Sequence, residues 1–147
     1  MRHKLGRYDE AIAAYDRALA IKPEDPDLLY NKGNALNRLG KYPEAIAALD
    51  KALSINPTDA SAWNNKGSAL NRLGKHADAI VSYDKALSLN ADDADAWFNK
   101  GNALTKLGQF QEAVNAYDRA LTINPDDAGR LKAGTPVAPV LGGEGLE

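Results

Sequence analysis

The sequence lacks cysteine, a strong charge of either sign and any long apolar run. The absence of cysteine excludes disulfides, thiolate metal sites and cysteine nucleophiles. A formal net charge of −2 gives no global attraction for nucleic acid or for an anionic membrane surface. No apolar stretch reaches the length of a signal-peptide core or of a membrane span. We therefore expect a soluble, cytoplasmic protein without nucleic-acid or membrane partners.

The sequence also lacks the residue patterns of an active site. It shows no nucleophile beside a base, no cluster of metal ligands and no glycine-rich phosphate loop. His3 lies near the start of the chain, and His76 occupies a row otherwise held by aromatic residues, where a packing role is expected. We predict that the protein is not an enzyme and needs neither metal nor cofactor.

Small and aromatic residues recur every 34 positions. The rows include Gly6, Gly40, Gly74 and Gly108; Ala11, Ala45, Ala79 and Ala113; and Tyr15, Leu49, Tyr83 and Tyr117. With Trp63 and Trp97 ahead of the helix glycines Gly67 and Gly101, this period resembles the tetratricopeptide repeat family from about Gly6 to Asp127. The resemblance implies an all-α, right-handed superhelical solenoid of antiparallel helix pairs. The first helix of each pair, helix A, would line the concave side, and the second would be helix B.

The period divides the chain into about three full repeats preceded by a half repeat. Residues 1–25 would hold only a helix B, from about 7 to 21, and residues 26–59, 60–93 and 94–127 one repeat each. Residues 128–147 read as a short partial cap and a Gly/Pro-rich tail. In the middle repeat we expect helix A near 60–73 and helix B near 77–89.

Polar residues mark the expected helix ends. Aspartates stand where the next helix needs an N-cap, at Asp25, Asp59, Asp93 and Asp127. Asparagines follow the B helices, where we expect left-handed C-caps, at Asn56, Asn90 and Asn124. Pro26 and Pro43 fit first-turn positions.

The A helices are rich in asparagine, which is a poor helix former. Eight asparagines, at up to about 0.7 kcal/mol each relative to alanine, cost on the order of 5 kcal/mol. The helix face opposite Trp63 and Gly67 carries Asn31, Asn34, Asn65, Asn99 and Asn102. An amide carries donors and an acceptor and matches a peptide bond. We therefore predict that this face bonds the main chain of an extended ligand, with Tyr30 and Phe98 adding apolar contact.

The family resemblance bears on the ligand. Asn31, Asn65 and Asn99 resemble the asparagine ladder with which the repeats of O-linked N-acetylglucosamine transferase hold a peptide backbone. The chaperone-tail clamp of the family needs two lysines and an arginine where this chain has Tyr30, Asp95 and Asn99. The resemblance thus implies that chaperone C-termini are poor candidates.

A row of cations ends the A helices at Arg38, Arg72 and Lys106. It can form a basic wall for an acidic ligand, with Asp27 and Asp95 at the opposite edge. The alternative, which we favour at this point, is that acids at helix starts and bases at helix ends suit the helix dipole.

These observations favour a non-catalytic protein–protein interaction scaffold that binds an extended peptide in an asparagine-lined concave groove. The alternative is a self-associating assembly or regulatory segment cut from a longer repeat protein, with an enzyme among the options. Ile12, Tyr15 and Leu19 are expected to lack a cover, which favours self-association through open repeat ends. Residues 135–141, biased to extended conformations by two prolines, are predicted to dock in the groove of a neighbouring copy. The alternative is that this tail folds back over the last B helix as a cap.

Overall fold

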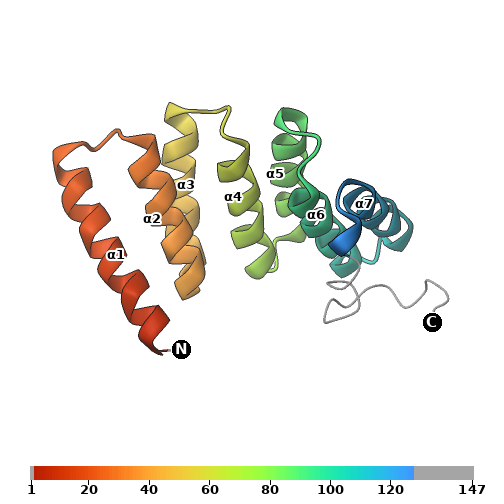
Figure 1. Cartoon of the computed structure of the whole chain (residues 1–147), viewed down its shortest axis with the longest axis horizontal. Coiled ribbons are helices and arrows are strands. Elements are labelled where there is room, and N and C mark those ends of the chain that lie inside the picture. The colour runs from red at the N-terminus through yellow and green to blue at the C-terminus, as the bar shows by residue number, and fades with distance from the viewer. Residues whose placement is uncertain (1, 128–147) are drawn as a thin grey trace.

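The computed structural model describes residues 2–127, with side chains from Gly6 onward. These residues form helices and no strand, which confirms the all-α prediction. The helices are α1 (Arg2–Ile21), α2 (Pro26–Leu39), α3 (Tyr42–Ile55), α4 (Ala60–Arg72), α5 (His76–Leu89), α6 (Ala94–Lys106) and α7 (Phe110–Ile123), followed by a 3-10 turn, η1 (Pro125–Asp127). Figure 1 shows them following one another along the long axis.

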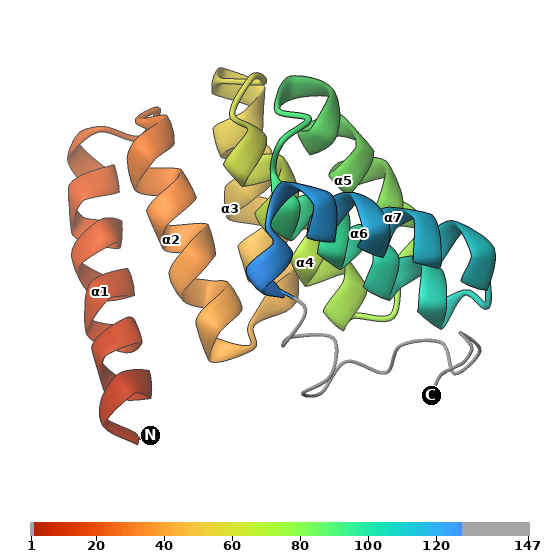
Figure 2. The same ribbon diagram turned by 45° about the vertical axis from the view of Figure 1, so that its right-hand side comes forward.

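The helices form two layers. Each packs against the next in the chain, and the A helices (α2, α4 and α6) also contact one another directly. Successive B helices (α1, α3, α5 and α7) do not come as close within the described residues. The A layer is therefore the inner side of the curve, and Figure 2 shows the helix directions turning from α1 to α7. This arrangement is a solenoid of helix pairs, as the period predicts.

Helix starts and turns follow from local chemistry. The Asp25 carboxylate accepts hydrogen bonds from the backbone N–H groups of Asp27 and Leu28, and Asp59 and Asp93 cap α4 and α6 in the same way. These three N-caps confirm the prediction. Each A helix ends in a turn through a glycine with positive φ: Gly40 (82°), Gly74 (84°) and Gly108 (79°). Any helix begun by Asp127 lies outside the described residues.

The prediction of left-handed asparagine C-caps is wrong. Asn56, Asn90 and Asn124 have φ values of −130°, −146° and −135°, which are extended. Each Oδ1 instead accepts the backbone N–H two residues on, as in an Asx turn. Asn56 and Asn124 precede prolines, which disfavour helical backbone in the preceding residue and so push it to extended conformations.

Glycines bring the two helices of a repeat together. A Cβ built at Gly67 would lie 2.6 Å from Cε1 of Tyr83, and one at Gly101 would lie 2.6 Å from Cε1 of Tyr117. Tyr83 is 1% exposed, so a buried ring occupies the space that a side chain at Gly67 would need. The close approach of α4 to α5 and of α6 to α7 depends on these glycines.

The first helix, α1, differs from its prediction in where it starts and in how far its apolar residues are buried. It begins at Arg2 rather than near residue 7, because Gly6 is helical and does not take the positive φ of its counterparts. Ile12, Tyr15 and Leu19 are half-buried rather than uncovered. Ile12 packs against the cluster of Leu36, Ala45 and Ala48. The expected docking of residues 135–141 lies outside the described residues.

Candidate functional site

The asparagines at positions 31, 65 and 99, here called the amide row, stand one on each A helix. Asn31 is exposed, and Asn65 and Asn99 are half-buried. Asn65 Nδ2 donates to the Tyr30 hydroxyl at 3.1 Å, and Asn99 Nδ2 donates to Asn64 Oδ1 at 3.5 Å. The row therefore faces the neighbouring A helices as well as solvent. Asn64 is a member of this network that the sequence reasoning did not single out.

The second asparagine position on the face differs between repeats. Asn102 Oδ1 accepts a hydrogen bond from the Tyr117 hydroxyl at 2.6 Å. Asn34 has no such partner, because Leu49 takes the position equivalent to Tyr117 and has no hydroxyl. Its side-chain amide forms no hydrogen bond within the described residues. Asn34 is thus available to a ligand, whereas Asn102 is engaged by the core through its oxygen.

Asn37 also joins two A helices. Its Nδ2 donates to the backbone carbonyl of Asn65 at 3.1 Å, while its Oδ1 is buried without a partner in residues 2–127. Its counterpart Asn71 accepts from His76 Nδ1 across the turn between α4 and α5 when that nitrogen carries the proton. His76 thus lies in a polar contact within its own repeat.

The aromatic positions divide between surface and core. Tyr30 is half-buried, packs against the cluster of Leu49, Leu53 and Ala62, and is held by Asn65. Phe98 is 6% exposed and packs on Tyr117 with ring centroids 5.6 Å apart. The expectation that Phe98 contacts a ligand is therefore corrected: an apolar ring at this position is drawn into the α6–α7 core, where it is removed from water.

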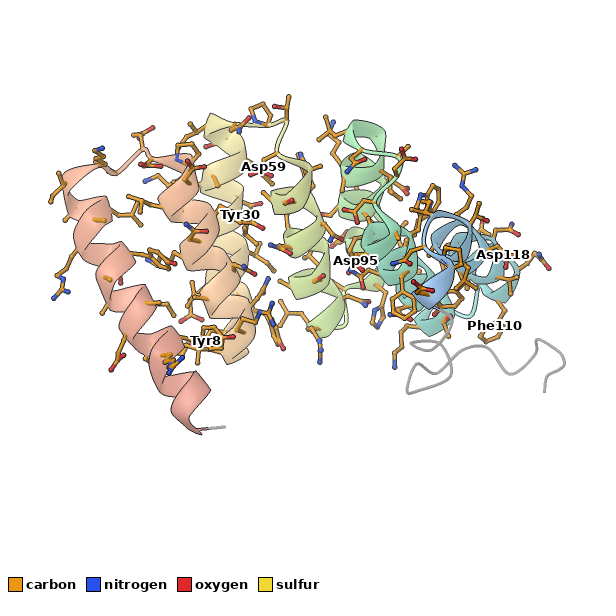
Figure 3. All side chains as sticks on the ribbon, viewed as in Figure 1. Tyr8, Tyr30, Asp59, Asp95, Phe110 and Asp118 are labelled. Carbon is orange, nitrogen blue, oxygen red and sulfur yellow. The ribbon has the colours of Figure 1, made fainter. Side chains whose placement is uncertain are left out.

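The cations at positions 38, 72 and 106, here called the basic row, are exposed and form no ion pair within the described residues. Burial raises the pKa of Tyr83 to about 12, partly offset by its hydrogen bond to Ser68 and by the positive charge of Arg72. The Tyr83 hydroxyl donates a hydrogen bond to Ser68 on the A helix of the same repeat. Figure 3 shows Asp59 at the edge where A helices begin, and Tyr8 and Phe110 at the opposite edge.

A second row of lysines is neutralised. Lys32, Lys66 and Lys100 each pair with an aspartate of the preceding B helix at 2.7 Å: Asp16, Asp50 and Asp84. These pairs recur once per repeat and link each A helix to the B helix before it. Only the basic row, and not this one, leaves positive charge unpaired on the A helices.

The other face of the solenoid carries clefts. One of about 720 Å³ is lined by Ile80, Trp97 and Arg119, and one of about 680 Å³ lies at the equivalent place, lined by Ile12, Leu29 and Lys51. Two cations lie over the Trp97 ring: Lys100 Nζ is 5.4 Å and Arg119 Cζ is 4.9 Å from the ring centroid. These clefts form where successive B helices diverge.

No group of three metal-ligating side chains occurs in the described part of the chain. Within the same residues, no helix is both long and apolar enough to cross a bilayer.

Known sequences and structures place the chain among repeat proteins. Family models described as tetratricopeptide repeat match residues 4–60, 48–81 and 94–127, and one described as TPR repeat matches residues 67–108. A solved structure of MamA is 30% identical, with a TM-score of 0.78 over 82% of this chain and 70% of that one. The chain belongs to the tetratricopeptide repeat family.

Two further solved structures of tetratricopeptide repeat proteins are similar. YrrB, described as a TPR protein with an unusual peptide-binding site, has a TM-score of 0.79 and 27% identity, over 87% of this chain and 66% of that one. The first TPR of Spaghetti (RPAP3), bound to the HSP90 peptide SRMEEVD, has a TM-score of 0.70 and 31% identity, over 73% of this chain and 85% of that one. A search of curated proteins finds no match.

Proposed function

We propose that this tetratricopeptide repeat chain is a non-catalytic interaction scaffold that binds the main chain of an extended peptide along the A helices. The observation that carries the proposal is the amide row, which presents a side-chain amide at the same register of α2, α4 and α6. Peptide recognition in the related RPAP3 and YrrB structures supports a peptide ligand in general.

The hydrogen bonds already made leave acceptors for a ligand. Asn65 and Asn99 each use Nδ2 toward the preceding A helix, and their Oδ1 atoms accept no bond within the described residues. Asn31 makes no side-chain bond there at all. Three amide oxygens, one on each A helix, can thus accept backbone N–H groups of a peptide. Asn34 adds a fourth amide on α2.

Main-chain recognition predicts weak dependence on the ligand's side chains. Peptide amides are the same in every sequence, so affinity comes from spacing and conformation and selectivity from groups at the edges. Tyr30 adds an apolar surface, and the basic row and Asp27 add charge at the two edges. This division separates the residues that hold a ligand from those that choose it.

An array of 12-residue peptides probed with the full chain tests the proposal. Peptides bound by the wild type should be lost when Asn31, Asn65 and Asn99 are replaced by alanine, and should weaken when their amides are N-methylated. The matched control is Asn115→Ala, because Asn115 is an exposed helical asparagine lining the cleft on the other face. Unchanged binding by the triple variant would overturn the proposal.

A further inference from the structure

The spacing of the A helices fixes the repeat distance that a ligand crossing them has to match. Side chains of α2 and α4 are hydrogen-bonded through Asn65 and Tyr30, and those of α4 and α6 through Asn99 and Asn64. Helices in direct side-chain contact lie about 8–10 Å apart. A ligand crossing α2, α4 and α6 therefore meets an equivalent amide about every 8–10 Å.

One backbone conformation has this repeat and also leaves its amides free. Polyproline II has three residues per turn and a rise of about 3.1 Å, so equivalent groups recur at about 9.3 Å, and it makes no internal hydrogen bonds. In a β-strand, side chains on one face recur at about 6.6 Å, a distance that does not match the spacing of the A helices. An α-helix bonds its own amides and has none to offer the amide row.

The basic row recurs at the same spacing as the amide row. Arg38 follows Asn31 by seven residues, two helical turns or about 10.5 Å along the same face, and Arg72 and Lys106 follow Asn65 and Asn99 likewise. These three cations are exposed and unpaired within the described residues, whereas the lysine row of Lys32 is neutralised. Each amide of the row thus has one unpaired positive charge at the same edge.

We propose that the A-helix face selects an internal peptide segment in the polyproline II conformation with an acidic residue at every third position. The inference rests on the proposed function and names the ligand class of that site. The amide row holds the backbone, and successive acidic side chains, all on one side of the threefold helix, lie opposite Arg38, Arg72 and Lys106. Since the charges that matter are side-chain carboxylates, the segment needs no free C-terminus.

Three fluorescein-labelled 12-residue peptides test the register. The first repeats Glu-Pro-Ser four times; the second has the same composition with glutamates at alternate positions; the third repeats Gln-Pro-Ser. Fluorescence anisotropy with the full chain should show the first binding about tenfold more tightly than the other two, since only its carboxylates recur at the spacing of the three exposed cations and each exposed ion pair adds a small gain in affinity. The advantage should shrink at high salt because exposed charges are screened.

Charge variants identify the groups that read the register. Replacing Arg38, Arg72 and Lys106 by glutamine should abolish the preference for the first peptide over the third, with the third still bound. The control replaces three exposed cations elsewhere, Lys41, Lys51 and Lys75, of which the first two line the cleft on the other face. Circular dichroism verifies that both variants fold.

The outcomes separate this inference from the function beneath it. If all three peptides bind equally, or if the control variant also loses the preference, the register is wrong while main-chain binding stands. If none of the three binds but other peptides bind and depend on the amide row, the ligand class is wrong. If no peptide depends on the amide row, both proposals fail.

Discussion

The side-chain amide of Asn65 on α4 donates a hydrogen bond to the Tyr30 hydroxyl on α2, with 3.1 Å between Nδ2 and the oxygen. The two residues lie in successive repeats, so the bond ties one A helix to the next. Asn31, the equivalent residue on α2, makes no such bond within the described residues. The amide row therefore combines a structural role at Asn65 with a free amide at Asn31.

Alanine at these two positions should have different effects on stability. Asn31→Ala gains helix propensity, up to about 0.7 kcal/mol, and loses no bond. Asn65→Ala gains the same but loses a hydrogen bond of about 0.5–1.5 kcal/mol. Urea denaturation should thus find Asn65→Ala less stable than Asn31→Ala by about 1 kcal/mol. A double-mutant cycle with Tyr30→Phe should recover the coupling, and additive effects would show that the bond contributes nothing.

The repeat period and the caps could be predicted because they depend on neighbours in sequence. A spacing of 34 residues indicates a repeated pair of helices, and an aspartate such as Asp59 caps the A helix that follows it. The contacts of the candidate site could not be predicted in this way. A helical wheel gives the direction of Asn65 relative to its own helix, but it does not give the position of the helix one repeat away. The bond to Tyr30 depends on the distance to that helix, and the burial of Phe98 depends on how α6 packs on α7.

One contact did leave a signal in the sequence. Tyr83 and Tyr117 each lie 15 residues after a polar residue of helix A, Ser68 or Asn102, and both pairs are in contact. Where the tyrosine is replaced by Leu49, the asparagine at 34 has no partner. Comparing rows between repeats would have separated Asn102, which the core engages, from Asn34, which is available.

Removing the tyrosine hydroxyls should cost more in the last repeat. The Tyr117 hydroxyl lies 2.6 Å from Asn102 Oδ1, whereas the Tyr83 hydroxyl lies 3.4 Å from Ser68 Oγ. We expect Tyr117→Phe to destabilise the fold by about 1 kcal/mol and Tyr83→Phe by less at neutral pH. Thermal denaturation of the two variants provides the comparison, and equal losses would contradict the difference in hydrogen bonding.

A methyl group at Gly67 should disrupt the packing of α4 on α5. Its Cβ would lie 2.6 Å from Cε1 and 2.8 Å from Cδ1 of Tyr83, a ring that is 1% exposed. We expect Gly67→Ala to destabilise the protein by about 1–3 kcal/mol. Gly6→Ala is the control, since nothing lies within 4 Å of a Cβ there, and it should stabilise α1 by about 0.5–1 kcal/mol. Equal stabilities in urea would rule out the steric argument.

Alkaline pH should destabilise the fold through Tyr83. Burial raises its pKa from 10.0 to about 12, so between these values the folded chain keeps a proton that the unfolded chain releases. Stability then falls as pH rises, because the unfolded state binds fewer protons. The contribution of Tyr83 is fully present below pH 10 and is lost as pH passes through 12, with a limit on the order of 2–3 kcal/mol.

The Tyr83→Phe variant isolates this effect, because it keeps the ring against Gly67 and removes the ionisable group. Urea denaturation at several values between pH 9 and pH 12 should give the variant a shallower loss of stability than the wild type. Some slope should persist, since burial also raises the pKa of Tyr117. Absorbance at the phenolate wavelength should show a tyrosine titrating near pH 12 in the wild type that is absent in the variant. Identical slopes in the two proteins would mean that Tyr83 ionises without opposing the fold.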